Sequence, residues 1–135
     1  MLIALDSNVF IAALSGNEEH SLAAQQLLRE VAAGKHRAVA SSIVYGEILS
    51  VSTGRVDLEG FFASVERLVT IPADDGVCLQ AGQLRQAHGG KLKLPDAMHA
   101  ATALLANADI FVTNDKQLAS VTQKIVPTKS LADWQ

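Results

Sequence analysis

The sequence has little cysteine, no excess of basic residues and no long hydrophobic run, and each shortage excludes a class of protein. Cys78 is the one cysteine in 135 residues, so no disulfide can form within the chain. Because disulfide-stabilised domains belong to oxidising compartments, this favours a cytoplasmic location. Cys78 lies in an apolar segment without a histidine partner nearby in sequence, and we expect it to be a packed thiol.

The charge balance excludes a generally basic nucleic-acid coat protein. The formal net charge is −3, and no long run of one sign occurs. A polyanion would therefore have to be held by a local basic patch or through metal ions. No apolar stretch approaches the ~20 residues that cross a membrane, and the N-terminus has no signal-peptide pattern. We expect no membrane association.

What is present is the composition of a globular chain, with 49% hydrophobic and 19% charged residues. The length suits one domain over residues 1–135. Short apolar runs that predict strands lie at residues 2–5, 38–40, 69–71, 110–112 and 125–126. Helical patterns lie between them, at residues 9–14, 18–33, 43–49, 57–68, 75–88, 97–106 and around 118. This alternation predicts a three-layer α/β domain with a mainly parallel central sheet.

The stretch from Leu2 to Asn8 organises this prediction. Residues 2–5 are wholly apolar, as expected of a strand buried on both faces. Asp6 follows at the strand end, where open α/β sheets bind their ligands. We expect Ser7 and Asn8 to cap the next helix. The alternative is that Asp6 is itself a cap or a turn residue.

Four acidic residues stand in apolar or small-residue surroundings. Asp6 and Asp115 each follow a predicted strand, Glu47 lies inside an apolar helix, and Asp96 begins an alanine-rich one. Gathering carboxylates is costly because like charges repel in a low dielectric, unless hard cations such as Mg²⁺ or Mn²⁺ offset the charge. The pattern favours metal-dependent phosphodiester hydrolysis. The alternative is three helix caps and one solvent-facing glutamate.

Four segments carry a resemblance to a known family, at residues 5–9, 45–48, 94–103 and 112–115. Together they resemble the motif series of PIN-domain ribonucleases, and more closely that of the VapC-type toxins of toxin–antitoxin pairs. The resemblance implies a PIN-like α/β/α fold, Mg²⁺- or Mn²⁺-dependent cleavage of RNA, a homodimer and a cognate antitoxin protein. It implies a metal-binding and catalytic set at Asp6, Glu47, Asp96 and Asp115. It also implies polar support from Asn8 and Thr113, and Asn114 could share the role of Asp115.

Other residues near these segments have two interpretations each. His99 lies three residues after Asp96 on the same helix, and we favour a buried, hydrogen-bonded histidine over a metal or phosphate ligand. The lysines near the acidic residues are either RNA-phosphate ligands or simply solvated; they are Lys91, Lys93 and Lys116. Trp134 packs either on the body of the protein or on a partner.

Three other functions compete with the ribonuclease. A haloacid dehalogenase-like phosphatase would use a strand-end aspartate as nucleophile, but it needs a second aspartate where this chain has Asn8. A receiver domain phosphorylated at Asp6 would need an adjoining acidic residue, which is absent. A catalytically silent PIN-like module that binds RNA or protein would be expected to lack one of the four acidic residues, and all four are present.

Overall fold

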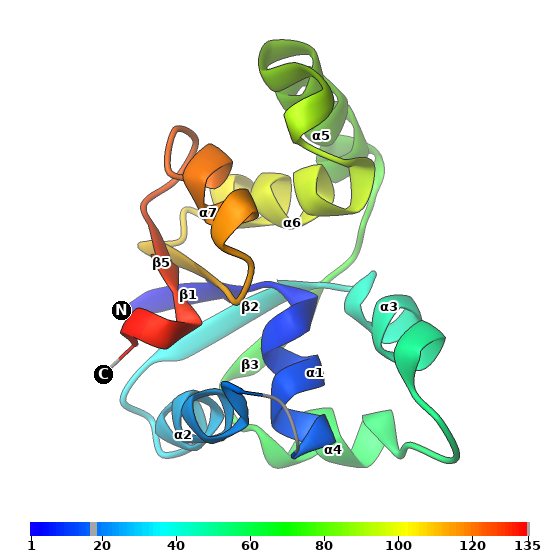
Figure 1. Ribbon diagram of the computed structural model, residues 1–135, viewed down its shortest axis with the longest axis vertical. Helices are drawn as coiled ribbons and strands as arrows, with labels where there is room; N and C mark the ends of the chain where they lie inside the picture. Colours follow the sequence, from blue (N-terminus) through cyan, green and yellow to red (C-terminus); the bar gives the residue numbers. More distant parts are fainter. Residues whose placement is uncertain (17–18, 135) are drawn as a thin grey trace.

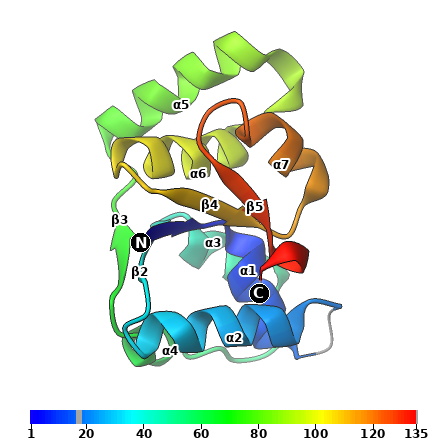
Figure 2. The same cartoon turned by 90° about the vertical axis from the view of Figure 1, so that its left-hand side faces the viewer.

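The central element of the fold is a parallel sheet, seen in a computed structural model that describes residues 1–16 and 19–134. In this part of the chain, five strands are ordered β3-β2-β1-β4-β5, and every neighbouring pair is parallel (Figures 1 and 2). The strands are β1 (Leu2–Leu5), β2 (Arg37–Ser41), β3 (Leu68–Ile71), β4 (Ile110–Thr113) and β5 (Thr128–Ser130). The predicted parallel sheet is confirmed.

Helices cover both faces of the sheet, which confirms the three-layer α/β/α architecture. They are α1 (Ser7–Ser15), α2 (Ser21–Ala32), α3 (Val44–Val51), α4 (Leu58–Ser64), α5 (Asp75–His88), α6 (Leu94–Leu105) and α7 (Lys116–Thr122). In Figure 1, α1, α2 and α4 lie below the sheet and α5, α6 and α7 above it, with α3 to one side. Within the described residues, no helix is long and apolar enough to cross a membrane.

Two hydrophobic cores result, one on each face, and β1 supplies both. Ile3 and Leu5 point into the core with α1 and α2, whereas Ala4 points into the core with α5 and α6. This alternation is the side-chain period of a strand. On α6, alanines such as Ala97 and Ala100 are fully buried. Because alanine is small, α6 packs closely on the sheet, and this brings the start of α6 to the strand ends.

All five strands end at the same side of the sheet, called here the carboxyl edge. The register pairs Leu5 with Val112 and Thr113 with Ser130, so that neighbouring strands finish nearly level. The residues that follow β1 and β4 therefore emerge side by side. This edge is where parallel sheets place their functional groups.

The prediction of a last strand at residues 125–126 is wrong. Those residues form the turn after α7, in which the N–H groups of Ile125 and Val126 both donate to the Thr122 carbonyl. Their apolar character reflects packing on the core of α5, α6 and α7. The actual strand β5 is a short polar segment at the sheet edge, where half-buried residues suffice.

Several helix predictions also need correction. The helix predicted over residues 57–68 ends at Ser64, and the turn that follows holds Arg67 at a φ of +69° before β3 begins. The predicted start at residue 18 lies outside the described residues, and α2 begins at Ser21. Leu22, near the start of α2, is 79% exposed. Cys78, expected to be packed, is exposed on α5.

Trp134 packs on the body of the protein, which decides between the two interpretations given for it. Its ring is almost buried in the core with α1 and α2. Its indole N–H donates to Glu30 of α2 at 3.3 Å. The ring also packs edge-on against His36, and the Lys129 ammonium lies 5.4 Å from its centroid.

Candidate active site

Asp6 lies at the carboxyl edge between β1 and α1 and is 3% exposed. It is the N-cap of α1, because its Oδ1 accepts the Ser7 N–H at 2.8 Å. Its Oδ2 accepts the Thr113 hydroxyl at 2.7 Å. The expectation that Ser7 and Asn8 cap this helix is wrong, since both lie inside its first turn. The two interpretations of Asp6 are compatible, because a helix cap and a strand-end carboxylate are the same group here.

Thr113 and Asn8 connect the ends of β1 and β4. The Thr113 hydroxyl donates to Asp6 and accepts the Asp115 N–H at 3.1 Å and the Asn8 side-chain amide at 3.3 Å. These bonds use its one donor and both of its acceptor positions. Asn8 Oδ1 accepts the Asn114 N–H at 2.9 Å. Both residues therefore hold the backbone around the acidic residues, as a supporting role requires.

Glu47 and His99 reach the site from opposite sides. Glu47 is in the first turn of α3 and is partly exposed, whereas His99 is on the buried face of α6. His99 Nε2 lies 2.6 Å from Glu47 Oε1 and 3.6 Å from Asp6 Oδ1. Because a carboxylate can only accept, Nε2 carries the proton and donates it. The favoured interpretation of His99 as a buried, hydrogen-bonded histidine is confirmed.

Asp96 is in the first turn of α6 and does not cap it, since Lys93 occupies the cap position. The pKa of Asp96 is raised from 3.8 to about 6. Burial is the largest cause, and the negative charges of Asp6, Asp115 and Glu47 raise it further. The nearby His99 opposes them. Carboxylates that are far apart in the sequence thus share one electrostatic environment.

The other titratable groups of the site shift in directions that reflect their burial and pairing. Burial raises the pKa of Asp6, although His99 and the Thr113 hydroxyl act against it. Burial also acts to raise the pKa of Glu47, but the hydrogen bond and charge of His99 lower it overall. The pKa of His99 is raised despite burial, because the bond to Glu47 and the charge of Asp6 favour the protonated ring.

Asp115 caps α7 and is exposed. Its Oδ1 accepts the N–H groups of Gln117 at 2.9 Å and Leu118 at 3.1 Å. The cap interpretation thus describes its bonding, while its charge still acts on Asp96. Within residues 1–16 and 19–134, no group of three or more histidine, cysteine, aspartate or glutamate side chains is arranged to hold a metal ion.

Sequence reasoning treated Ser7 only as a helix cap, and it did not identify the contacts of Ser7 with the acidic residues or the pairing of Glu47 with His99. Ser7 gives its backbone N–H to Asp6, and its side chain helps to lower the pKa of Glu47. Its place directly after a strand-end aspartate was the available signal. The sequence held no signal for the pairing of Glu47 with His99, because these two residues lie 52 positions apart.

The three candidate lysines are exposed and flank the acidic residues in the chain. Lys91 ends the 3-10 turn before α6, Lys93 is at the cap position of α6, and Lys116 begins α7. Lys91 and Lys93 therefore lie just before the helix that carries Asp96, and Lys116 is the first residue of the helix that Asp115 caps. Arg85, in contrast, is engaged in the fold, since its Nε donates to the Leu92 carbonyl at 2.9 Å.

Comparison with solved structures finds the same fold in proteins of low sequence identity. VapBC2 from Rickettsia felis, bound to a promoter DNA fragment, has a TM-score of 0.68 at 20% identity, covering 96% of this chain and 98% of that one. A toxin–antitoxin complex from Klebsiella pneumoniae has a TM-score of 0.64 at 24% identity, covering 88% and 91%. FitAcB from Neisseria gonorrhoeae has a TM-score of 0.65 at 18% identity, covering 98% and 99%.

Sequence comparison identifies the family. No curated protein matches the chain in sequence. The model of the PIN domain family, however, matches residues 3–124, a range that contains all four acidic residues and both strand ends that carry the site. The chain therefore belongs to the PIN-domain family, whose members are typically nucleases.

Proposed function

We propose that this protein is a metal-dependent endoribonuclease and the toxin of a toxin–antitoxin pair. The observation that carries the proposal is the gathering of Asp6, Asp115 and Glu47 around the half-buried Asp96, whose pKa rises to about 6 through burial first and through these neighbouring charges second. Such a concentration of negative charge at the carboxyl edge suits a cation-dependent site. The RNA substrate implies that the protein acts in the cytoplasm.

The donor chemistry of these residues fits a hard divalent cation, although no three of them are grouped as metal ligands in the described part of the chain. The four acidic candidates offer carboxylate oxygens and Asn114 offers an amide oxygen, and oxygen is the donor that Mg²⁺ and Mn²⁺ prefer. Burial is the main cause of the raised pKa of Asp96, and the charges of Asp6, Asp115 and Glu47 add to it against the opposing charge of His99. Asp6, Glu47, Asp96 and Asp115 would hold the ion, and Asn114 could share the role of Asp115. PIN domains are generally dependent on divalent metals.

A bound divalent ion would polarise the scissile phosphate and activate the attacking water. The chain's own residues prepare the site for this. Thr113 and the Ser7 N–H fix both oxygens of Asp6 before substrate arrives. Lys91, Lys93 and Lys116 would bind phosphates on either side of the scissile bond. Asn8 would hold the backbone before Asp115 in place through its bond to Asn114.

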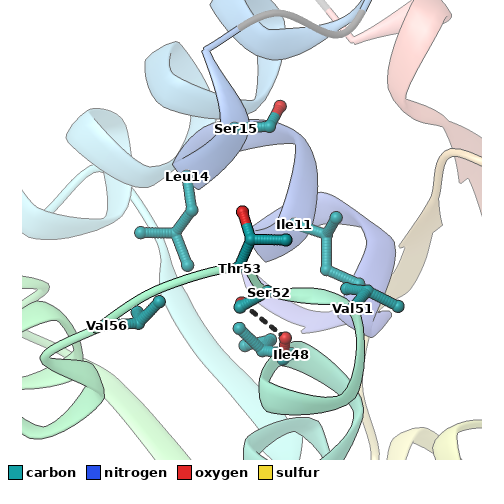
Figure 3. A pocket seen from close by; sticks show the side chains of 8 residues that line it. All are labelled: Ile11, Leu14, Ser15, Ile48, Val51, Ser52, Thr53 and Val56. Atoms are coloured by element: carbon teal, nitrogen blue, oxygen red, sulfur yellow. Dashed lines mark hydrogen bonds between the residues drawn. The ribbon is translucent and has the colours of Figure 1, made fainter.

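The proposed antitoxin would use a largely apolar pocket lined by the same two helices that carry Asn8 and Glu47. This pocket, of about 460 Å³, lies between α1 and the end of α3 and is lined by apolar side chains such as Ile11, Leu14 and Val51 (Figure 3). Both helices carry a site residue just before the lining begins, Asn8 before Ile11 and Glu47 before Ile48. An apolar partner segment in the pocket would place its next residues over the carboxylates, where an arginine or lysine would offset their charge.

A homodimer is also proposed, as the family resemblance implies. Large apolar side chains stay exposed on several elements, including Leu49 on α3, Val69 on β3 and Leu79 on α5. Apolar groups of this size gain about 1.5–3 kcal/mol each when fully buried. Measuring the mass in solution by light scattering tests this proposal, and a monomer at high concentration would contradict it.

The enzymatic proposal is tested with purified protein and labelled single-stranded or loop-containing RNA. Cleavage should require Mg²⁺ or Mn²⁺ and should be lost in Asp6→Asn. The matched control is Asp109→Asn, because Asp109 precedes β4 at the opposite edge of the sheet, where it accepts the Leu2 N–H. Undiminished cleavage in excess EDTA would reject metal dependence. Inhibition by the antitoxin should weaken when its basic residue is replaced by alanine.

A further inference from the structure

His99 is a polar residue in a position where an apolar one would pack without cost. It is 2% exposed and lies on the alanine-rich face of α6 that packs on the sheet. Its Nδ1 is buried and has no hydrogen-bond partner among the residues that the structure describes. A buried nitrogen without a hydrogen-bond partner destabilises the fold. The benefit of a histidine here must come from its other nitrogen.

That nitrogen, Nε2, makes one short bond across the site. It lies 2.6 Å from Oε1 of Glu47, which is carried by a different helix. Glu47 has a long side chain that is 31% exposed, so it has several rotamers open to it unless a contact selects one. The same Nε2 is 3.6 Å from Oδ1 of Asp6. The bond therefore selects the rotamers of Glu47 that turn its carboxylate toward Asp6.

We propose that His99 is a positioning residue, which holds the Glu47 carboxylate where a divalent cation bound by Asp6 and Asp96 can reach it. The inference rests on the proposed function. His99 itself does not contact the ion or the RNA and acts only through Glu47. Residues that orient metal ligands by a hydrogen bond usually matter for affinity, and their loss costs about 10- to 100-fold.

The test is Mn²⁺ binding without RNA, measured by calorimetry on the wild type and on three variants. His99→Leu fills the space but removes the donor, and we expect it to weaken Mn²⁺ binding about 10- to 100-fold. His99→Gln can place an amide N–H near the position of Nε2 and should recover most of the affinity. His99→Asn places its amide near Nδ1 and should not. If histidine only fills space, the two amides should behave alike.

His36→Leu is the matched control, because His36 also has a buried Nδ1 without a partner among the described residues. It lies beside Glu30 and Trp134, away from the four acidic residues of the site. This variant should leave Mn²⁺ affinity unchanged. Thermal melts in EDTA identify any variant that fails to fold. If His99→Leu does not fold, the comparison of His99→Gln with His99→Asn still decides.

A double-mutant cycle tests whether His99 acts through Glu47. In the Glu47→Ala background, His99→Leu should cause no further loss of Mn²⁺ affinity, since the group it positions is gone. Additive losses would overturn the inference, as would wild-type affinity in His99→Leu. A wild-type protein that binds no Mn²⁺ would instead reject the proposed metal dependence, and the inference with it.

Discussion

The Thr113 hydroxyl donates to Oδ2 of Asp6 at 2.7 Å and so ties the end of β4 to the end of β1. The two residues are 107 positions apart in the chain, yet the parallel register places them side by side. Asp6 is almost fully buried, so this bond is one of the few that offset the cost of burying its charge. The fold and the acidic site thus share a structural support.

Replacing Thr113 with valine should therefore reduce both stability and activity. Valine keeps the shape but removes the hydroxyl, leaving Asp6 Oδ2 and the Asp115 N–H without this partner. We expect a loss of about 1–3 kcal/mol in the free energy of unfolding, measured by denaturant titration, together with weaker RNA cleavage.

Two comparisons isolate the hydroxyl of Thr113. Thr113→Ser keeps it and should retain most of the activity. Thr102→Val removes another buried hydroxyl, which among the described residues bonds the Met98 carbonyl within α6. That variant should keep normal cleavage. Equal losses of activity in both valine variants would mean that the effect is general destabilisation.

Asp96 should oppose folding at neutral pH when no metal is bound. Its pKa is about 6 in the folded protein against an ordinary value of 3.8. Since the folded state binds this proton more tightly, stability from this group is lost as the pH rises from about 4 to about 6. Asp96→Asn removes the charge and should raise stability at pH 7 in EDTA by about 0.5–2 kcal/mol, after allowance for solvent screening.

Comparing wild type with Asp96→Asn at two pH values tests whether the charge of Asp96 causes the difference in stability. Denaturant titrations at pH 7 and pH 4 should show the variant more stable than wild type only at the higher pH, because the wild-type carboxyl is protonated at pH 4. A variant that is less stable than wild type at pH 7 would mean that Asp96 stabilises α6 as a structural residue.

Added metal should reverse the order of the two proteins. Mg²⁺ or Mn²⁺ that binds only the folded state adds about 2.7 kcal/mol at one hundred times its Kd. Wild type should gain melting temperature, while Asp96→Asn should gain little and cleave RNA about 100-fold more slowly. Asp109→Asn, at the other edge of the sheet, should respond like wild type. Equal stabilisation of all three proteins would remove Asp96 from the site.

The parts of the site that could be predicted from the sequence are those in which local order fixes position. Asp6 directly follows β1, and Asp115 comes two residues after the end of β4. A parallel sheet brings such strand ends to one edge. The bond between His99 and Glu47 could not be predicted in this way. It depends on how α3 and α6 sit relative to each other, which no local pattern encodes.

The errors in the fold have a similar origin. β5 is a three-residue polar edge strand, whereas the apolar pair at residues 125–126 is buried in a turn, so hydrophobicity indicated the wrong segment. Leu22 lies about 180° around α2 from the buried Val31, at 3.6 residues per turn, so it points away from the core and is 79% exposed. An apolar residue inside a helix is therefore not buried by its type alone, because its angular position on the helix decides whether it faces the core.

The three lysines should contribute to RNA affinity through phosphate contacts. Lys91, Lys93 and Lys116 are exposed beside the helices that begin at the carboxyl edge, so each can approach a phosphate without moving the backbone. Replacing all three with glutamine should weaken RNA binding, measured by fluorescence anisotropy in EDTA so that cleavage does not interfere. Since single-stranded binding falls with salt by about 0.7 log units per contact per log unit of salt, the salt slope should decrease by about 2.

The control for these lysines is Lys35→Gln with Lys124→Gln. Lys35 precedes β2 and Lys124 precedes β5, so both lie toward the strand starts, away from the carboxyl edge. This variant also removes positive charge but should leave the salt slope unchanged. If the triple variant keeps the wild-type slope, the three lysines are only solvated and RNA is held elsewhere. If the control variant lowers the slope as much per lysine, the attraction is one of overall charge rather than of defined phosphate contacts.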